Sequence, residues 1–228
     1  MPIGNNKIMV RLREALRRGV RLLDLESNRD VEYGFARRHV TGEGASVLDV
    51  GGCGSLLNLY LARKGFRVTV FDARPYHEQH PNIESVTGDF LENELPESSF
   101  DFVTLISTIE HIGFGSYGAP THEDGDFDAM EQVKRVLKPE GKIIVTFPFT
   151  GEHKVIPGFE RWYDRERAAR LFDGLHVHVS EYYVPDTTFL GRRFFSPSTP
   201  EHIAQTERLY NCQGCACFVL SPQPPDGL

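Results

Sequence analysis

Residues 46–61 place an apolar strand, a turn of small residues and the start of a helix directly after one another. The segment SVLDV at 46–50 predicts a buried strand, and LLNLYL at 56–61 begins a helical apolar pattern. Between them, the glycines of GGCG at 51–54 permit positive φ and let a ligand come close to the backbone. A strand, a glycine turn and a helix N-terminus form the layout by which α/β proteins bind nucleotides.

Four further apolar segments predict strands that alternate with helices. They lie at residues 66–71, 83–87, 100–106 and 142–147. Repeated alternation of this kind predicts an α/β fold with a parallel sheet and right-handed crossovers, rather than an antiparallel sandwich. Small, polar or acidic residues follow the carboxyl ends of these strands, among them Asp72 and Asp89. In an open parallel sheet, this edge is where the ligand lies.

The order of these motifs resembles the class I S-adenosylmethionine-dependent methyltransferases. The matching motifs are Leu-Asp-Val-Gly at 48–51, Asp72 after the second strand and Gly-Asp-Phe at 88–90. Ile-Glu-His-Ile at 109–112 and Leu-Lys-Pro-Glu-Gly-Lys at 137–142 are similar to the type 11 branch. More narrowly, residues 107–118 and 124–130 resemble a bacterial and archaeal group often found beside polysaccharide genes.

The resemblance implies a Rossmann-like sheet of seven strands, mostly parallel, with the last strand antiparallel and helices on both faces. The sixth strand is expected at 176–184 and the last at 215–221, with turns and an aromatic patch between them that can cover the acceptor. We expect an N-terminal helical segment over 1–45, a cofactor-binding domain over 46–222 and a disordered tail over 223–228. Short helices are predicted at 31–39 and at 164–172, the second with Asp164 as N-cap, and a loop at 150–160.

One motif departs from the family pattern. In the usual D-x-G-x-G-x-G, the second and third glycines are replaced here by Cys53 and Ser55. Both residues are small and Gly52 and Gly54 flank Cys53, so we expect the turn to persist along a shifted path.

The resemblance implies that S-adenosylmethionine is the cofactor. Asp49 would orient the glycine turn and interact with the methionine end, although a turn-capping aspartate is the alternative. Asp72 would accept hydrogen bonds from the ribose hydroxyls, or else be a surface carboxylate at a strand end. Asp89 would accept from the adenine amine beside Phe90, which could equally belong to the core. The expected cofactor residues are Asp49, Gly51, Gly52, Cys53, Gly54, Asp72, Ala73, Asp89, Phe90 and Ser107.

Glu110 and His111 follow the fourth strand, close to where the sulfonium of the cofactor would lie. Methyl transfer to a hydroxyl requires removal of its proton, and histidine titrates in the useful range. We therefore expect His111 to be the general base and Glu110 to orient it or bind the substrate; a structural histidine is the alternative. His153, just after the fifth strand, is the rival base across the same opening.

Acidic residues and cysteines elsewhere admit a metal site, which we do not favour. The candidate set for a divalent metal is Glu110, His111, His122, Asp124, Asp126 and Asp128. Residues 124–128 do not match an EF-hand, and their carboxylates suit the N-terminus of a following helix. Cys215 and Cys217 alternate within a predicted strand, which places them on one face as small buried side chains rather than in a zinc site or disulfide.

Length and charge narrow the class of partner. A chain of 228 residues suits one well-buried α/β domain. It has no apolar run near the ~20 residues of a membrane span and no secretory pattern, so we expect a cytoplasmic protein. A net charge of −7 disfavours nucleic acid and favours a small-molecule or saccharide acceptor. The basic helix predicted at 6–25 is expected to be a solvated face, with binding to an anion or membrane as the alternative.

Three functions are compatible with these features. The first is transfer of a methyl group from S-adenosylmethionine to an oxygen of a small or sugar-like acceptor. The second is a nicotinamide-dependent oxidoreductase or epimerase, although Cys53 and Ser55 disrupt the pyrophosphate motif and no Tyr-x-x-x-Lys pair is present. The third is a non-catalytic partner subunit with the same fold. The oligomeric state is not predicted.

Overall fold

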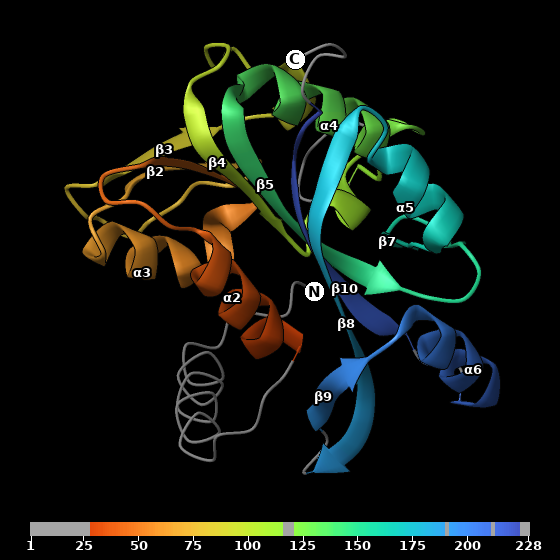
Figure 1. Cartoon of the computed structure of the whole chain (residues 1–228). Helices are drawn as coiled ribbons and strands as arrows, with labels where there is room; N and C mark the ends of the chain where they lie inside the picture. Colours follow the sequence, from red (N-terminus) through yellow and green to blue (C-terminus); the bar gives the residue numbers. More distant parts are fainter. Residues whose placement is uncertain (1–27, 116–120, 190–191, 211–212, 224–228) are drawn as a thin grey trace, which may run out of the picture.

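The computed structural model describes residues 28–115, 121–189, 192–210 and 213–223 (Figure 1). The predicted basic helix at 6–25 and the tail beyond residue 223 lie outside the described residues. The expected division of the chain after residues 45 and 222 therefore remains a prediction.

An eight-stranded sheet forms the centre of the fold, in the order β3-β2-β1-β4-β5-β10-β8-β9. Its parallel strands are β1 (Ser46–Val50), β2 (Arg67–Asp72), β3 (Ile83–Thr87), β4 (Phe100–Ile106) and β5 (Leu137–Phe149). The central strands β1 and β4 are buried along nearly their whole length, as expected for a parallel sheet covered on both faces. The predicted α/β fold is confirmed.

The second half of the sheet is antiparallel. As predicted, the last strand, β10 (Gly214–Pro222), is antiparallel, and it lies between β5 and β8 (Leu175–Phe189). The predicted count of seven strands is wrong, because β9 (Arg192–Ser198) adds an eighth, antiparallel to β8. Pro197 suggests a turn in the sequence, but an edge strand such as β9 tolerates proline.

A helix also lies within the stretch predicted as turns. The helix α6 (Pro200–Tyr210) begins with a proline, whose missing N–H costs nothing at the first helical position. The side chain of Thr199 accepts a hydrogen bond from the backbone N of His202 at 3.2 Å and caps this helix.

Helices cover both faces of the sheet (Figure 1). The helices α2 (Asn28–His39) and α3 (Leu57–Arg63) contribute Phe35 and Leu61 to the hydrophobic cluster on one face. On the other face, α4 (Gly125–Val136) and α5 (Arg165–Leu171) contribute Met130 and Leu171. The predicted helices at 31–39 and 164–172 are confirmed.

Short elements follow the carboxyl ends of the parallel strands. The 3-10 helices η1 (Gly52–Gly54), η2 (Phe90–Glu92) and η3 (Ile109–His111) come soon after β1, β3 and β4. After β5, the residues predicted as a loop form a hairpin of β6 (Lys154–Ile156) and β7 (Glu160–Trp162). Gly158 allows the tight turn between these strands, because its φ is 70°.

Cys215 and Cys217 are buried free thiols, with their sulfur atoms 3.9 Å apart. Their predicted burial on one face of a strand is confirmed.

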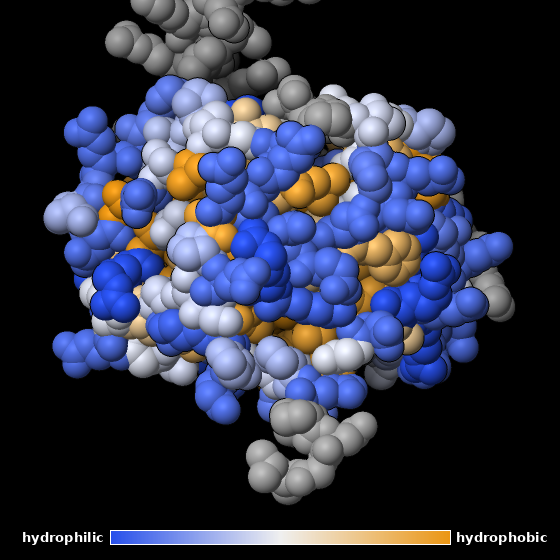
Figure 2. All heavy atoms as spheres, turned by 90° about the horizontal axis from the view of Figure 1, so that it is seen from above, coloured by the Kyte–Doolittle hydropathy of each residue, from blue (hydrophilic) through white to orange (hydrophobic). Residues whose placement is uncertain are grey.

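In the described part of the chain, no helix is long and apolar enough to cross a membrane. Figure 2 shows hydrophilic side chains over most of the face seen from above, with hydrophobic ones in separate small patches.

Asp164 provides a test of the local contacts that define α5. Its carboxylate accepts hydrogen bonds from the backbone N of Arg167 at 2.8 Å and of His153 at 3.0 Å. We predict that Asp164→Ala lowers the free energy of unfolding in urea by about 1–2 kcal/mol, the usual cost of a lost N-cap. The exposed residue Asp173, replaced by alanine, is the control and should change it by less than about 0.5 kcal/mol. Equal effects of the two substitutions would contradict the capping role.

Candidate functional site

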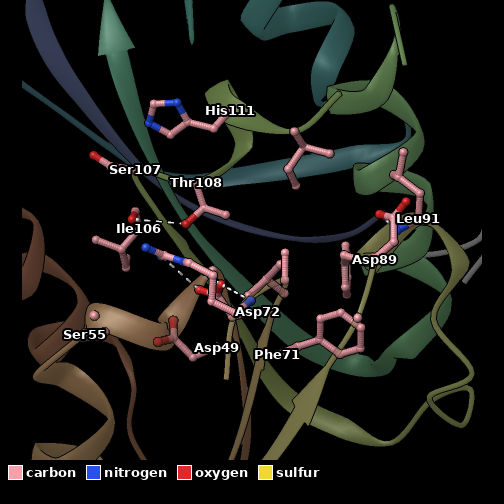
Figure 3. A pocket seen from close by; sticks show the side chains of 18 of the residues that line it. Asp49, Ser55, Phe71, Asp72, Asp89, Leu91, Ile106, Ser107, Thr108 and His111 are labelled. Atoms are coloured by element: carbon pink, nitrogen blue, oxygen red, sulfur yellow. Dashed lines mark hydrogen bonds and ion pairs between the residues drawn. The ribbon is translucent and has the colours of Figure 1, made fainter. Parts of the chain in front are cut away.

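A cavity of about 240 Å³ lies at the carboxyl ends of the parallel strands (Figure 3). Figure 3 shows Asp49 and Asp72 on one side of this cavity and His111 on the opposite side. Of the residues predicted to bind a cofactor or to act in catalysis, the cavity is lined by Asp49, Gly51, Gly54, Asp72, Ala73, Asp89, Phe90, Ser107 and His111. Gly52, Cys53, Glu110 and His153 are not among its described lining residues.

The glycine turn fits closely between β1 and η3. Gly51 has a φ of 75°, and a Cβ atom there would lie 2.4 Å from the side chain of Thr108. A Cβ atom on Gly52 would lie 2.4 Å from a carboxylate oxygen of Asp49. Both positions therefore exclude a side chain, the first because of the cavity wall and the second because of the buried aspartate.

Cys53 keeps the turn intact. Its backbone N donates to Asp72 at 2.9 Å, and its sulfur lies 3.3 Å from the carbonyl oxygen of Pro75. Ser55, the other departure from the family pattern, accepts a hydrogen bond from the backbone N of Leu57 at 3.1 Å and lines the cavity. The predicted turn is present, as the 3-10 helix η1, and a shift of its path relative to the family pattern remains a prediction.

Asp49 is buried beneath the turn. Its Oδ1 accepts a hydrogen bond from the hydroxyl of Thr104 at 2.5 Å, and its Oδ2 has no hydrogen-bond partner among the described residues. Burial raises the pKa of the Asp49 carboxyl to about 6. Because the Nδ2 of Asn58 donates to the carbonyl of Gly52 at 2.9 Å, the underside of the turn is fixed by polar side chains.

Asp72 is also buried, at the end of β2. Its Oδ1 accepts from the backbone N of Arg74 at 2.9 Å and from its Nε at 3.2 Å, while its Oδ2 accepts from Cys53. The carboxylate therefore connects the end of β2 to the glycine turn and faces the cavity beside a cationic side chain.

Asp89 and Phe90 line the cavity after β3. The side chain of Asp89 caps η2 by accepting from the backbone N of Leu91 at 3.1 Å. The ring of Phe90 is buried and packs edge-on against Phe71, with ring centroids 5.4 Å apart. Phe90 thus contributes to the core and to the cavity wall at the same time.

Helix α2 reaches the cavity with residues that the sequence analysis missed. Arg29 and Tyr33 line it, and the guanidinium of Arg29 donates to the carbonyl oxygen of Ile106 at 2.9 Å. Arg29 also lies 3.5 Å from Glu32, which is fully buried. A glutamate among the apolar positions of a helix is the signal that could have revealed this polar contact.

Glu32 holds the ends of β4 and β5 together. One of its oxygens accepts hydrogen bonds from Ser107 and, at 2.8 Å, from Thr146. Ser107 has a φ of 45°, a left-handed conformation that is uncommon for a residue other than glycine. The side-chain hydrogen bond to Glu32 supports this conformation, which directs the chain from β4 into η3.

His111 is oriented by the hairpin that follows β5. Its Nδ1 lies 2.7 Å from the carbonyl oxygen of Phe159, and a carbonyl only accepts hydrogen bonds. Nδ1 therefore carries the proton, and in the neutral ring Nε2 is the basic nitrogen. Nε2 lies 3.9 Å from an oxygen of Glu110, a buried carboxyl whose pKa is raised well above its ordinary value by burial.

His153 occupies a different environment. Its Nδ1 lies 2.8 Å from the carbonyl oxygen of Trp162, and it borders the hairpin rather than the cavity. The structure brings His111, and not His153, to the cavity.

The acidic residues considered for a metal site are dispersed. Asp126 is buried between Arg161 and Arg167, at 3.5 and 2.9 Å, and accepts a hydrogen bond from Tyr163 at 3.0 Å. Asp128 pairs with His122 at the surface, at 3.1 Å. Within the described ranges, no group of three or more histidine, cysteine, aspartate or glutamate side chains is placed to hold a metal ion.

The buried carboxyl of Asp49 predicts a pH dependence of stability. The pKa of Asp49 is about 6 in the folded protein and has an ordinary value of 3.8. The contribution of this group to the free energy of unfolding is therefore fully present below pH 3.8 and is lost as the pH rises through 6. Between pH 4 and pH 8, the free energy of unfolding of wild type should therefore fall by on the order of 2–3 kcal/mol more than that of Asp49→Asn. Urea unfolding without ligand measures this difference.

Asp101→Asn is a control of opposite sign. Desolvation raises the pKa of Asp101, but hydrogen bonds from Lys138 and Ser46 outweigh it and lower this pKa to about 2. This variant should lose stability relative to wild type above pH 4. A parallel pH dependence of wild type and Asp49→Asn would show that Asp49 ionises normally.

Comparison with known proteins supports this fold. A family model described as "Caenorhabditis protein of unknown function, DUF268" matches residues 78–187, less than half of the chain. A ubiquinone biosynthesis O-methyltransferase of Schizosaccharomyces pombe is 28% identical over 142 residues, 56% of this chain and 47% of that protein. A demethylmenaquinone methyltransferase of Lysinibacillus sphaericus is 28% identical over 112 residues, 49% of this chain and 40% of that protein. The chain thus spans less than half the length of these curated relatives.

Solved structures match over more of the chain. A 1,6-didemethyltoxoflavin-N1-methyltransferase of Burkholderia thailandensis, with bound S-adenosylhomocysteine, has a TM-score of 0.63 and 15% identity, covering 98% of this chain and 93% of that one. A putative methyltransferase in complex with the Trm112 activator of Haloferax volcanii has a TM-score of 0.59 and 16% identity, covering 86% and 92%. The [4+2]-cyclase SpnF has a TM-score of 0.61 and 16% identity, covering 86% and 81%. The chain therefore has the α/β fold of class I S-adenosylmethionine-dependent methyltransferases.

Proposed function

We propose that this protein transfers a methyl group from S-adenosylmethionine to an oxygen of a small, sugar-like acceptor. One observation carries the proposal: acidic residues at the carboxyl-terminal ends of three successive strands, Asp49 in β1, Asp72 at the end of β2 and Asp89 just after β3, meet at one cavity with the glycine turn. In open α/β sheets, this edge binds nucleotide-like ligands.

The lining of the cavity suits the parts of S-adenosylmethionine. The carboxylate of Asp72 can accept hydrogen bonds from ribose hydroxyls, in exchange for its contacts with the half-exposed side chain of Arg74. Phe71, Phe90 and Leu91 offer apolar surface to the adenine ring. Arg29 supplies a positive charge for the carboxylate of the methionine end.

His111 is the residue that we propose removes the proton of the acceptor. When bound, S-adenosylmethionine supplies an electrophilic methyl group on a positively charged sulfur. The hydrogen bond from Nδ1 to the carbonyl of Phe159 leaves Nε2 as the proton acceptor in the neutral ring. The same carbonyl stabilises the imidazolium after proton transfer and orients the ring, whereas Glu110, at 3.9 Å from Nε2, lies beyond hydrogen-bond distance.

The finer parts of the proposal have separate supports. Transfer to oxygen is supported by the name of the Schizosaccharomyces pombe relative, an O-methyltransferase. A sugar-like acceptor is supported by the resemblance of residues 107–118 and 124–130 to proteins found beside polysaccharide genes. The fold alone does not define the reaction, since a protein named a cyclase shares it.

Cofactor binding is tested by calorimetric titration with S-adenosylhomocysteine. We predict that the wild-type protein binds S-adenosylhomocysteine and that Asp72→Ala has a roughly 10- to 100-fold higher dissociation constant. The reason is that hydrogen bonds to a charged acceptor contribute about 1.5–3 kcal/mol. Glu84→Ala, which removes an exposed carboxylate on the neighbouring strand β3, should bind as wild type does. Absence of binding at high micromolar concentration, or tight binding of NAD instead, would refute the proposal.

The proposed base is tested separately from cofactor binding. His111→Ala should keep the affinity for S-adenosylmethionine within a few-fold and lower turnover by roughly 10²–10⁴. His153→Ala, the matched control, should keep most of the turnover because its ring borders the hairpin. Near-normal turnover of His111→Ala would exclude it as the base, and a joint loss of binding and thermal stability would indicate a structural histidine.

A further inference from the structure

The hairpin of β6 and β7 exposes an unusual amount of apolar surface. In the described part of the chain, five large hydrophobic side chains are exposed, and three of them belong to this hairpin. They are Val155, Ile156 and Phe159, with 47%, 36% and 52% of their surface exposed, and we call them the hairpin tip. Exposed apolar groups that gather in one place commonly mark a binding site.

The hairpin tip adjoins the cavity. The ring of Phe159 packs edge-on against the ring of His111, with centroids 5.4 Å apart, and its carbonyl oxygen contacts Nδ1 of the same histidine. His111 and the next residue, Ile112, line the cavity. An acceptor whose hydroxyl lies at His111 would therefore have the hairpin tip as its neighbour.

The base of the hairpin is fixed by polar contacts. The buried side chain of Arg161 donates to the carbonyl oxygens of Ile112 at 2.6 Å and of Glu123 at 2.7 Å. On the other strand, Lys154 pairs with the buried carboxylate of Glu207. The exposed tip thus projects from an element whose base is anchored.

The size and chemistry of the hairpin tip favour a small apolar occupant. A stable protein interface buries about 800 Å² on each partner, far more than three side chains provide. The hydroxyl groups of a sugar require hydrogen-bonding partners, and the side chains of Val155, Ile156 and Phe159 offer none, so the tip suits the apolar part of a ligand.

We infer that the acceptor carries an apolar group, alkyl or aromatic, joined to its hydroxylated part, and that the hairpin tip binds this group while the hydroxyl lies at His111. The inference rests on the proposed methyl transfer and adds the class of acceptor. It assigns to Val155, Ile156 and Phe159 the selection of acceptors with an apolar group.

The test compares short and long members of two series of probes. Methyl and octyl β-D-glucoside represent a sugar headgroup, and 4-methylcatechol and 4-octylcatechol represent an aromatic one. Binding is measured by calorimetry below the aggregation concentration of each probe, with the protein saturated by S-adenosylhomocysteine. For wild type we expect the octyl member of at least one series to bind about 10-fold more tightly than its methyl member, because part of the chain is buried.

Three variants locate the preference on the molecule. The measured quantity is the ratio of the dissociation constant of the methyl probe to that of the octyl probe. The double variant Val155→Ser/Phe159→Ser should reduce this ratio to below about 3-fold, and Ile156→Ser should reduce it in part. The backbone carbonyl of Phe159 remains in the double variant, so its contact with His111 is retained. Val177→Ser, which removes a valine of similar exposure on β8 (41%, against 47% for Val155), is the matched control and should keep the wild-type ratio of the two dissociation constants. The melting temperature of each variant verifies that it is folded. Substitutions at exposed positions should leave this temperature unchanged.

The outcomes separate this inference from the function on which it rests. If S-adenosylhomocysteine does not bind, the proposed function is wrong and the inference is lost with it. If it binds and neither octyl probe binds more tightly than its methyl partner, only the inference is refuted. A preference that persists in the double variant, or that disappears in Val177→Ser, would also refute it.

Discussion

The buried carboxylate of Glu32 is the contact on which the candidate site depends. It comes from α2, outside the sheet, and accepts hydrogen bonds from Ser107 after β4 and from Thr146 on β5. The sulfur of Cys215 on β10 lies 3.8 Å from the same oxygen. One side chain thus joins a helix to three neighbouring strands at the edge where the cavity opens. Without these bonds, a buried charge would be left without hydrogen-bond partners at considerable cost.

The two sides of the cavity differ in how readily the sequence reveals them. On the side that we propose for the cofactor, the turn at 51–54, Asp72 and Asp89 lie at the ends of strands that are recognisable from their apolar pattern, so local signals suffice to locate them. Arg29 and Glu32 were missed because they belong to a helix upstream of the first strand. Only the tertiary fold brings that helix to the ends of β4 and β5.

The side of the cavity that we propose for the acceptor was predicted less well. Prolines and glycines at 150–160 and 185–213 indicate turns, but the same residues also occur in tight hairpins, on edge strands and at the first position of a helix. The hairpin, β9 and α6 were therefore not recognised. His153 has the same residue type and position after a strand as His111, and only the packing of the hairpin distinguishes them.

The buried charges around Asp126 have a consequence for how the wall of the cavity at Ile112 can move. Asp126 at the start of α4 pairs with Arg161 on the hairpin and Arg167 on α5, and Arg161 also holds the carbonyl of Ile112. Breaking one of these pairs would leave a desolvated charge, so the joined segments are coupled mechanically. A displacement of the hairpin would therefore carry Ile112, which lines the cavity, along with it, so this part of the cavity wall and the hairpin form one mechanical unit.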